Sequence, residues 1–161
     1  KRILREAAAL GVGGIRFFKA EKGEPGYANS SFYREARFLS FLSEGAVQAF
    51  STHLPDVKVF PSLRESLCGL YDNNRLALDN YEAGISLGSA EFVAVEPLVL
   101  ALGPERGWSV SERDLLRNSG FRLVHLGPRV LKTETACIAA VAIVLSRAGF
   151  WQDYSCGGQI G

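Results

Sequence analysis

Apolar positions recur along the chain at two spacings, one typical of helices and the other of strands. The helical spacing and its flanking signals predict helices over residues 1–10, 32–50, 62–66, 109–120 and 133–145. Short apolar runs predict strands over residues 15–19, 57–60, 69–71, 97–102 and 122–126. The stretches 22–31 and 72–89 are predicted to be irregular. This alternation indicates an α/β domain with a mainly parallel sheet and helices on both faces.

Local signals indicate where the last two helices begin. Ser109 is followed three residues later by Glu112, which predicts a capping box. Thr133 is predicted to cap the final helix, whose residues 136–145 carry no charged or strongly polar side chain. A helix that is apolar on every side must be buried on every side. We therefore expect this helix to pack on the sheet and also against a second copy of the chain.

Two loops at predicted strand ends share the sequence Leu-Gly-Pro, at residues 102–104 and 126–128. Ligands of open α/β sheets bind at the carboxyl ends of the strands, and glycine allows a close approach of the backbone. The two loops could hold one flat ligand between them, or they could simply be tight turns. Neither loop has a phosphate-binding sequence.

Composition and charge exclude some classes of protein. The chain has 161 residues, of which 47% are hydrophobic, so it can form one domain with a sizeable core. No apolar run is long enough to span a membrane. The net charge of +1 is a weak basis for binding nucleic acid, so for an RNA substrate the positive charge must be local or supplied elsewhere. Three cysteines without CxxC spacing favour reduced thiols and a cytoplasmic location. No residues have metal-ligand spacing.

Two segments in the last third of the chain resemble one known family. Residues 102–107, followed by Ser109-Val-Ser-Glu112, resemble the "GPEGG-F-S-x-x-E" segment of the RsmE family of ribosomal RNA uridine-N3 methyltransferases. Residues 126–136, LGPRVLKTETA, resemble the "LGxRILRTETA" signature of that family. Residues 10–15 and 44–55 are similar to its "ELGVxxI" and "EAxxQ…P" segments. The resemblance extends over about residues 1–150.

The resemblance implies a SPOUT methyltransferase domain over residues 1–161, whose C-terminal segment is threaded through a loop as a trefoil knot. It implies S-adenosyl-L-methionine as cofactor and methyl transfer to N3 of a uridine in 16S ribosomal RNA. It further implies that the partners are small-subunit ribosomal RNA and a second copy in a homodimer. A first strand and a PUA-like RNA-binding domain are expected before Lys1.

The resemblance and the loop positions together predict the site residues. Arg129 is the first candidate to act on the RNA or on the cofactor carboxylate, and Glu105 is the second catalytic candidate. Contacts to RNA are expected from Arg129, Lys132 and Gln48. Plain core packing is the alternative for the leucines, and a structural role is the alternative for Glu105. The residues expected to bind the cofactor are Leu102, Gly103, Pro104, Gly107, Leu126, Gly127 and Leu131.

Three positions depart from the family pattern. Arg106 stands where the family has the second glycine of GPEGG, Lys132 replaces an arginine, and Ser51 stands where an arginine is usual. These departures leave open a related knotted methyltransferase that acts on another RNA nucleotide. A non-catalytic RNA-binding or assembly protein with the same fold, and a generic nucleotide-binding domain, are further alternatives. Binding of S-adenosylmethionine and the loss of one N3-methyluridine in a deletion strain would discriminate among them.

Overall fold

The computed structural model describes residues 1–23, 38–71 and 73–151, which contain two parallel sheets. The smaller sheet pairs β1 (Gly14–Phe18) with β2 (Asp56–Phe60). The larger sheet has the strand order β4-β3-β5, and both of its pairings are parallel. Its strands are β3 (Asn74–Leu78), β4 (Leu98–Leu102) and β5 (Arg122–Val124). The predicted α/β class with parallel strands is confirmed.

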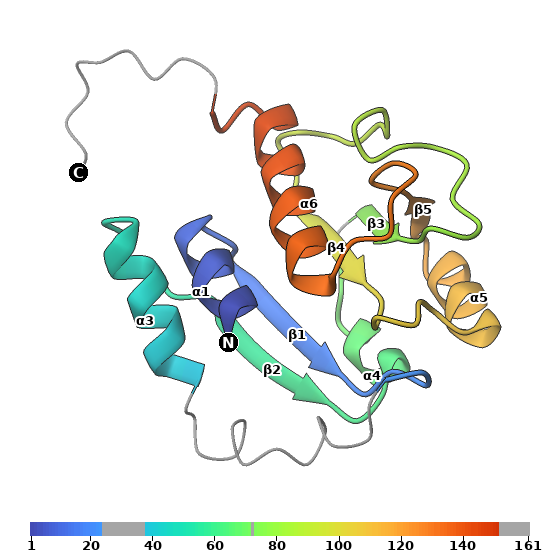
Figure 1. Cartoon of the computed structure of the whole chain (residues 1–161), viewed down its shortest axis with the longest axis horizontal. Coiled ribbons are helices and arrows are strands. Elements are labelled where there is room, and N and C mark those ends of the chain that lie inside the picture. Colours follow the sequence, from blue (N-terminus) through green and yellow to red (C-terminus); the bar gives the residue numbers. More distant parts are fainter. Residues whose placement is uncertain (24–37, 72, 152–161) are drawn as a thin grey trace.

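Helices cover both faces of the larger sheet and one side of the smaller one (Figure 1). Neighbouring residues of β3 belong to different cores: Ala77 packs with the α5 side and Leu76 with the α6 side. This alternation is what a strand buried on both faces requires. The helices are α1 (Arg2–Ala9), α3 (Phe38–Gln48), α4 (Leu63–Leu67), α5 (Val110–Asn118) and α6 (Thr133–Arg147).

A glycine brings α1 and α3 into close contact. A Cβ atom at Gly45 would lie 2.0 Å from the carbonyl oxygen of Arg5, so no other residue fits there. Leu4, Ala8 and Leu42 fill the core between these helices and the smaller sheet. The close approach of the two helices therefore depends on glycine at position 45, which has no side chain.

The predicted strand at residues 69–71 is wrong, and the central strand β3 lies in the segment that was predicted to be irregular. Gly69 has φ +70 and belongs to the turn after α4. Strand β3 begins with two polar residues, which hid it from a search for apolar runs. Both are satisfied by hydrogen bonds: Asn74 binds the backbone of Val93, and the Arg75 guanidinium donates to Ser119 O at 2.6 Å.

Helix boundaries agree with the sequence in some places and differ in others. The capping box of Ser109 and Glu112 is confirmed. Thr133 does not cap α6, because the N-cap residue is Lys132, which makes no side-chain cap hydrogen bond. Helix α3 begins at Phe38 in the described structure and ends at Gln48, while predicted helical residues 32–37 lie outside the described residues.

Helix α6 lies between α1 and the larger sheet. Ala140 is its buried residue, and the other residues of 136–145 remain partly exposed. The full burial predicted from its apolar sequence is therefore not reached within one copy of the chain. No helix in the described part of the chain is long and apolar enough to cross a membrane.

Candidate functional site

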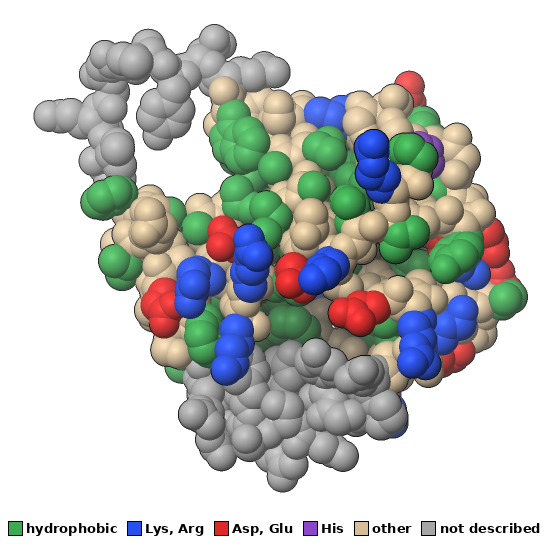
Figure 2. Space-filling view, in the orientation of Figure 1, with side chains coloured by type: hydrophobic (Ala, Val, Ile, Leu, Met, Phe, Trp, Pro, Cys, Tyr) green, Lys and Arg blue, Asp and Glu red, His purple; other side chains and the backbone are tan. Residues whose placement is uncertain are grey.

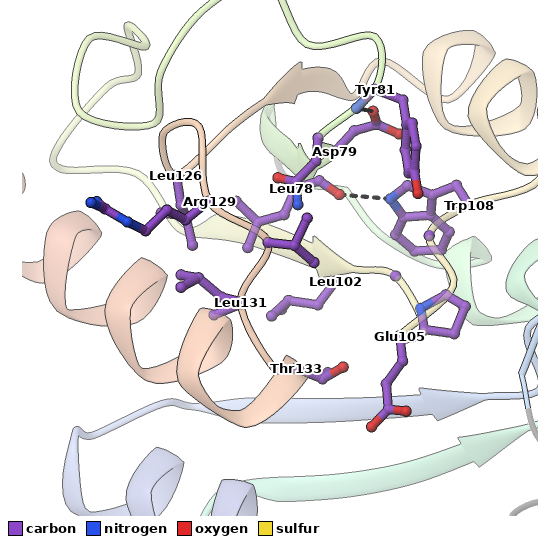
Figure 3. A pocket seen from close by; sticks show the side chains of 16 residues that line it. Leu78, Asp79, Tyr81, Leu102, Glu105, Trp108, Leu126, Arg129, Leu131 and Thr133 are labelled. Carbon is purple, nitrogen blue, oxygen red and sulfur yellow. Dashed lines mark hydrogen bonds between the residues drawn. The ribbon is translucent and has the colours of Figure 1, made fainter.

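A pocket opens at the carboxyl ends of β3 and β4, where the segments after β3, β4 and β5 meet the start of α6 (Figure 3). This is the edge of a parallel sheet where ligands are expected. The two predicted loops that begin with Leu-Gly-Pro, at residues 102–104 and 126–128, come together there. The lining residues are Leu78, Asp79, Asn80, Tyr81, Leu102, Gly103, Pro104, Glu105, Gly107, Trp108, Leu126, Arg129, Val130, Leu131, Thr133 and Ala136.

Four leucines form the apolar part of the pocket. Leu102, Leu126 and Leu131 were predicted, and Leu78 joins them from the end of β3. All four are partly exposed, whereas neighbouring Trp108 is almost fully buried. They therefore keep apolar surface available to a ligand.

The glycines of the first loop pack against aromatic rings. A Cβ atom at Gly103 would lie 3.1 to 3.3 Å from three atoms of the Trp108 indole. Gly107 has φ +69, and a Cβ atom there would lie 2.9 Å from Cε2 of Tyr81. The indole N–H of Trp108 donates to Leu78 O at 2.8 Å and joins the loop to the end of β3. These glycines have a packing role, which sequence reasoning had not identified.

The second loop is shaped by a left-handed glycine and a histidine. Gly127 has φ +103, a conformation that strains any residue with a side chain. Its N–H donates to Nδ1 of His125 at 3.0 Å, so the histidine has a structural partner. Gly127 lies within this loop but is not among the residues that line the pocket. A substitution there would strain the backbone before it tested ligand binding.

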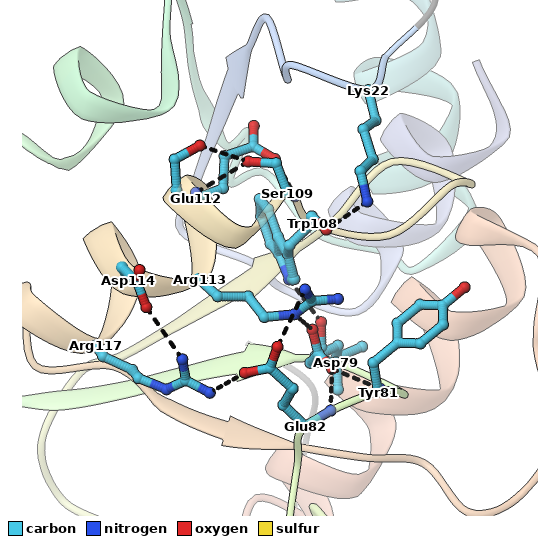
Figure 4. Close-up of polar contacts among 12 residues, drawn as sticks. Lys22, Asp79, Tyr81, Glu82, Trp108, Ser109, Glu112, Arg113, Asp114 and Arg117 are labelled. Carbon is cyan, nitrogen blue, oxygen red and sulfur yellow. Dashed lines mark hydrogen bonds and ion pairs between the residues drawn. The ribbon is translucent and has the colours of Figure 1, made fainter.

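A buried ion-pair network lies beside the pocket (Figure 4). The side chains of Arg113 and Asp79 are 7% and 0% exposed, and Nε of Arg113 donates to Oδ2 of Asp79 at 2.5 Å. Arg113 also lies 3.3 Å from Glu82, which in turn pairs with Arg117. Burial alone would raise the pKa of Asp79. The hydrogen bonds from Arg113 and from two backbone N–H groups outweigh burial and hold that pKa below its usual range.

The loop after β1 is tied to the start of α5. Nζ of Lys22 donates to Trp108 O at 3.0 Å, and the Glu21 carboxylate accepts from the Ser111 hydroxyl at 2.8 Å. Hydrogen bonds from Ser109 and Ser111 lower the pKa of the Glu21 carboxyl. These hydrogen bonds hold the smaller sheet next to the first Gly-Pro loop.

The structure brings together most, but not all, of the predicted site residues. Arg129 and Glu105 both line the pocket and are exposed, and neither has a polar partner among the described residues. Figure 3 shows the Arg129 side chain pointing away from the leucines, while the Glu105 carboxylate lies on another side. Lys132 is exposed next to the pocket without lining it. Gln48 is exposed at the end of α3 and does not line the pocket.

Sequence reasoning missed part of the lining. Asp79, Asn80 and Tyr81 follow a strand that the apolar pattern did not reveal, so nothing placed them at the sheet edge. Trp108 lies directly after the first loop, and its aromatic side chain was the signal that could have identified it. The described residues contain no group of three or more His, Cys, Asp or Glu able to hold a metal ion.

Comparison with known proteins identifies relatives for nearly the whole chain. The family described as "RNA methyltransferase domain" matches residues 1–145. The chain is 37% identical over 158 residues to "Ribosomal RNA small subunit methyltransferase E" of Treponema pallidum, covering 94% of this chain and 59% of that protein.

Two solved structures have the same fold. A putative methyltransferase from Legionella pneumophila in complex with bound SAM matches with a TM-score of 0.79 and 24% identity. A ribosomal RNA small subunit methyltransferase E from Neisseria gonorrhoeae bound to S-adenosyl methionine matches with a TM-score of 0.71 and 27% identity. Each alignment covers 91% of this chain and 60% of the other. The chain thus spans about three fifths of the length of these relatives, and it belongs to the RNA methyltransferase domain family.

Proposed function

We propose that this chain is the catalytic domain of an enzyme that transfers a methyl group from S-adenosylmethionine to N3 of a uridine in 16S ribosomal RNA. The observation that carries this proposal is the pocket where both signature loops meet at the ends of parallel strands. The relatives from Treponema pallidum and Neisseria gonorrhoeae are both named ribosomal RNA small subunit methyltransferase E, and the second is bound to S-adenosyl methionine.

The residues present fit this cofactor. The four leucines offer apolar surface to an adenosine, and the Gly-Pro loops expose backbone groups beside them. The proposal therefore keeps the predicted cofactor-binding residues that line the pocket, which are Leu102, Gly103, Pro104, Gly107, Leu126 and Leu131, and gives Gly127 the role of shaping the second loop. When bound, the cofactor supplies an electrophilic methyl group on a positively charged sulfur.

The protein's own contribution to the reaction is mainly to position the uridine and to favour loss of its N3 proton. Arg129 is exposed at the pocket with no described partner, so its charge is free to attract phosphate or a deprotonated uracil. Glu105 lines the same pocket and is a candidate to accept the proton. Lys132 follows Arg129 closely in the sequence and would add a second positive charge for contact with the RNA backbone.

The charge distribution limits how this chain holds RNA. On the described part of the face in Figure 2, basic and acidic side chains are interspersed rather than gathered into one basic patch. A further RNA-binding domain before Lys1, as in the proposed domain organisation, would supply the missing affinity. Gln48, which does not line this pocket, would then contact RNA elsewhere or serve the site of another copy.

A SPOUT-type trefoil knot is proposed for the C-terminal part of the chain. Its support is the segment between β3 and β4, which crosses the end of β5. Ser86 pairs with His125, and Leu87 N–H donates to His125 O at 2.8 Å. Arg147, at the end of α6, donates to Leu87 O at 3.0 Å, so this segment also touches the far end of the last helix. The chain after β5 thus leaves the sheet beside a loop that could encircle it.

A homodimer located in the cytoplasm is also proposed. The support for the dimer is the partly exposed apolar surface of α6. Partly exposed residues over 136–145 leave an apolar surface for a second copy. Each copy would bury roughly 800 Å² in a stable interface. X-ray scattering at micromolar concentration should give the mass of a dimer, and a monomer would contradict this part of the proposal.

Two measurements test the function. Calorimetry should detect binding of S-adenosylmethionine, and mass mapping of 16S ribosomal RNA from a deletion strain should show the loss of one N3-methyluridine. Loss of a different methylated nucleotide would favour the related enzyme with another target. A folded protein that binds no S-adenosylmethionine would favour the non-catalytic RNA-binding alternative.

A further inference from the structure

Tyr81 lies at the edge of the pocket and takes no part in the proposed binding of the cofactor. It lines the pocket beside Gly107, yet it is 73% exposed. The leucines of the pocket are only partly exposed. The ring of Tyr81 is therefore more accessible than they are to a ligand that enters the pocket from solvent. A ring this exposed contributes little to core packing and is accessible to a ligand in the pocket.

Three contacts position Tyr81, one at its backbone and two at its ring. Its backbone N–H donates to Oδ1 of Asp79 at 2.6 Å, which fixes the start of the loop. The guanidinium of Arg113 lies over the ring at 5.3 Å from its centroid. Gly107 packs so closely against Cε2 that a side chain at that position would collide with the ring. Figure 4 shows the side chains of Tyr81 and Arg113 next to each other, beside the carboxylate of Asp79.

The charges around Arg113 indicate what this support does. Its guanidinium pairs with Asp79 and Glu82, so its charge is neutralised within the network. It therefore orders the ring rather than attracting an anion. Ordering an exposed aromatic ring lowers the entropy cost of stacking a flat ligand on it.

We propose that Tyr81 is a base-stacking residue for the RNA, with Arg113 and Asp79 as its positioning residues. This inference rests on the proposed function, because it assigns the ring to the RNA substrate of that same pocket. Aromatic side chains and guanidinium planes are the groups on which proteins stack unpaired RNA bases. The leucines already offer the adenosine an apolar surface, which leaves the exposed ring for a base that enters from solvent.

The test compares three variants of the protein. Tyr81→Leu keeps an apolar side chain without a π face, Tyr81→Phe keeps the ring, and Tyr71→Leu is the matched control. Tyr71 is 90% exposed and does not line the pocket. Two affinities are measured: that for S-adenosylmethionine by calorimetry, and that for 16S ribosomal RNA in the presence of S-adenosylhomocysteine, which cannot donate a methyl group.

We expect Tyr81→Leu to weaken RNA binding roughly 5- to 150-fold, equivalent to the ~1–3 kcal/mol of one base stack. Tyr81→Phe should restore most of the RNA affinity, and cofactor affinity should not change. Unchanged RNA affinity in Tyr81→Leu would overturn the inference. A loss of cofactor affinity alone would assign the ring to adenine and would also overturn it.

Arg113→Lys tests the positioning role, since lysine keeps the charge toward Asp79 but removes the planar group behind the ring. RNA affinity should fall while cofactor affinity remains. An equal loss of both would mean that the network only supports the fold. The wild-type protein separates this inference from the proposed function: absence of methyl transfer there refutes the function, whereas RNA binding still reports on Tyr81.

Discussion

The indole N–H of Trp108 donates a hydrogen bond to the carbonyl oxygen of Leu78 at 2.8 Å, and this bond links the first Gly-Pro loop to the end of the central strand. Trp108 is 1% exposed and belongs to the core on the α5 side of the sheet. Its backbone carbonyl also accepts from Lys22, so three segments distant in sequence converge on this residue. The shape of the pocket at the strand ends depends on it.

Replacement of Trp108 by phenylalanine should destabilise the protein. The substitution removes the indole donor from the part-buried hydrogen bond to the Leu78 carbonyl, and the smaller ring leaves a cavity in the core, so we expect a cost of about 1–3 kcal/mol. Urea denaturation should show a lower midpoint with little change in slope. Trp151→Phe is the control, because Trp151 is 53% exposed and should tolerate the change. Equal stability of the two variants would contradict a structural role for the indole bond.

A methyl group at Gly103 should disturb the same contact. Its Cβ atom would lie 3.1 Å from the nearest Trp108 atom, and the buried indole cannot move away easily. We expect Gly103→Ala to cost about 1–3 kcal/mol, as overpacking does. At Gly84 nothing lies within 4 Å of the added atom, so Gly84→Ala should be neutral or slightly stabilising. Thermal melts of both variants would check this contrast, and a neutral Gly103→Ala would refute the packing argument.

Loss of the Asp79 carboxylate should destabilise the protein in a pH-dependent way. Asp79→Asn leaves Arg113 buried with a weaker partner, at a cost of about 3 kcal/mol at pH 7. The pKa of Asp79 is lower in the folded protein than the ~3.9 of an unfolded chain. Its contribution is therefore complete above about pH 4 and is lost as the pH falls through the folded pKa.

Urea denaturation of wild type and Asp79→Asn at pH 7 and pH 3 tests this linkage. The stability difference should be smaller at pH 3, because the unfolded wild-type chain then binds a proton at Asp79 more readily than the folded protein, whose Asp79 pKa is lower. Asp114→Asn is the control, since Asp114 is 60% exposed in its pair with Arg117 and should change stability little at either pH. A difference for Asp79→Asn that stays constant with pH would show that its charge does not matter.

Much of this fold could be read from the sequence because apolar patterning reports burial. The run Leu98–Leu102 is apolar throughout, and the structure places it in a parallel sheet. Strand β3 was not predicted because its polar residues form hydrogen bonds with partners distant in sequence: Asn74 with Val93, and Arg75 with Ser119. Such partners are set by tertiary structure and leave no periodic signal along the chain.

The candidate site was likewise predictable from the sequence only where its features are local. The two Leu-Gly-Pro segments could be identified from the sequence because strand ends and glycines are local features. Tyr81 could not, since its place at the pocket depends on β3 and on a buried pair with a sequence separation of 34 residues between Asp79 and Arg113. Gln48 fits the family pattern, yet the end of α3 does not line this pocket.

We expect replacement of Arg129 to separate RNA recognition from cofactor binding. It is exposed at the pocket, has no described polar partner, and points away from the leucines. Arg129→Ala should therefore leave stability within about 0.5 kcal/mol of the wild type, as for other exposed sites. If the guanidinium holds RNA, methyl transfer should fall by a large factor while S-adenosylmethionine affinity stays nearly intact. Arg129→Lys should restore transfer only in part, because lysine keeps the charge but not the planar fork.

Calorimetry and a methyl-transfer assay on the same Arg129 variants decide between the possible partners. If Arg129 instead binds the carboxylate of the cofactor, cofactor affinity itself should fall by about 1.5–3 kcal/mol, the range for a charged hydrogen bond. The direction of its side chain, away from the apolar wall where an adenosine would lie, favours the RNA. Arg122→Ala is the control, since Arg122 is also exposed but lies at the start of β5 and outside the pocket. Unchanged transfer and unchanged cofactor binding in Arg129→Ala would reduce Arg129 to a surface charge and would leave Glu105 as the remaining catalytic candidate.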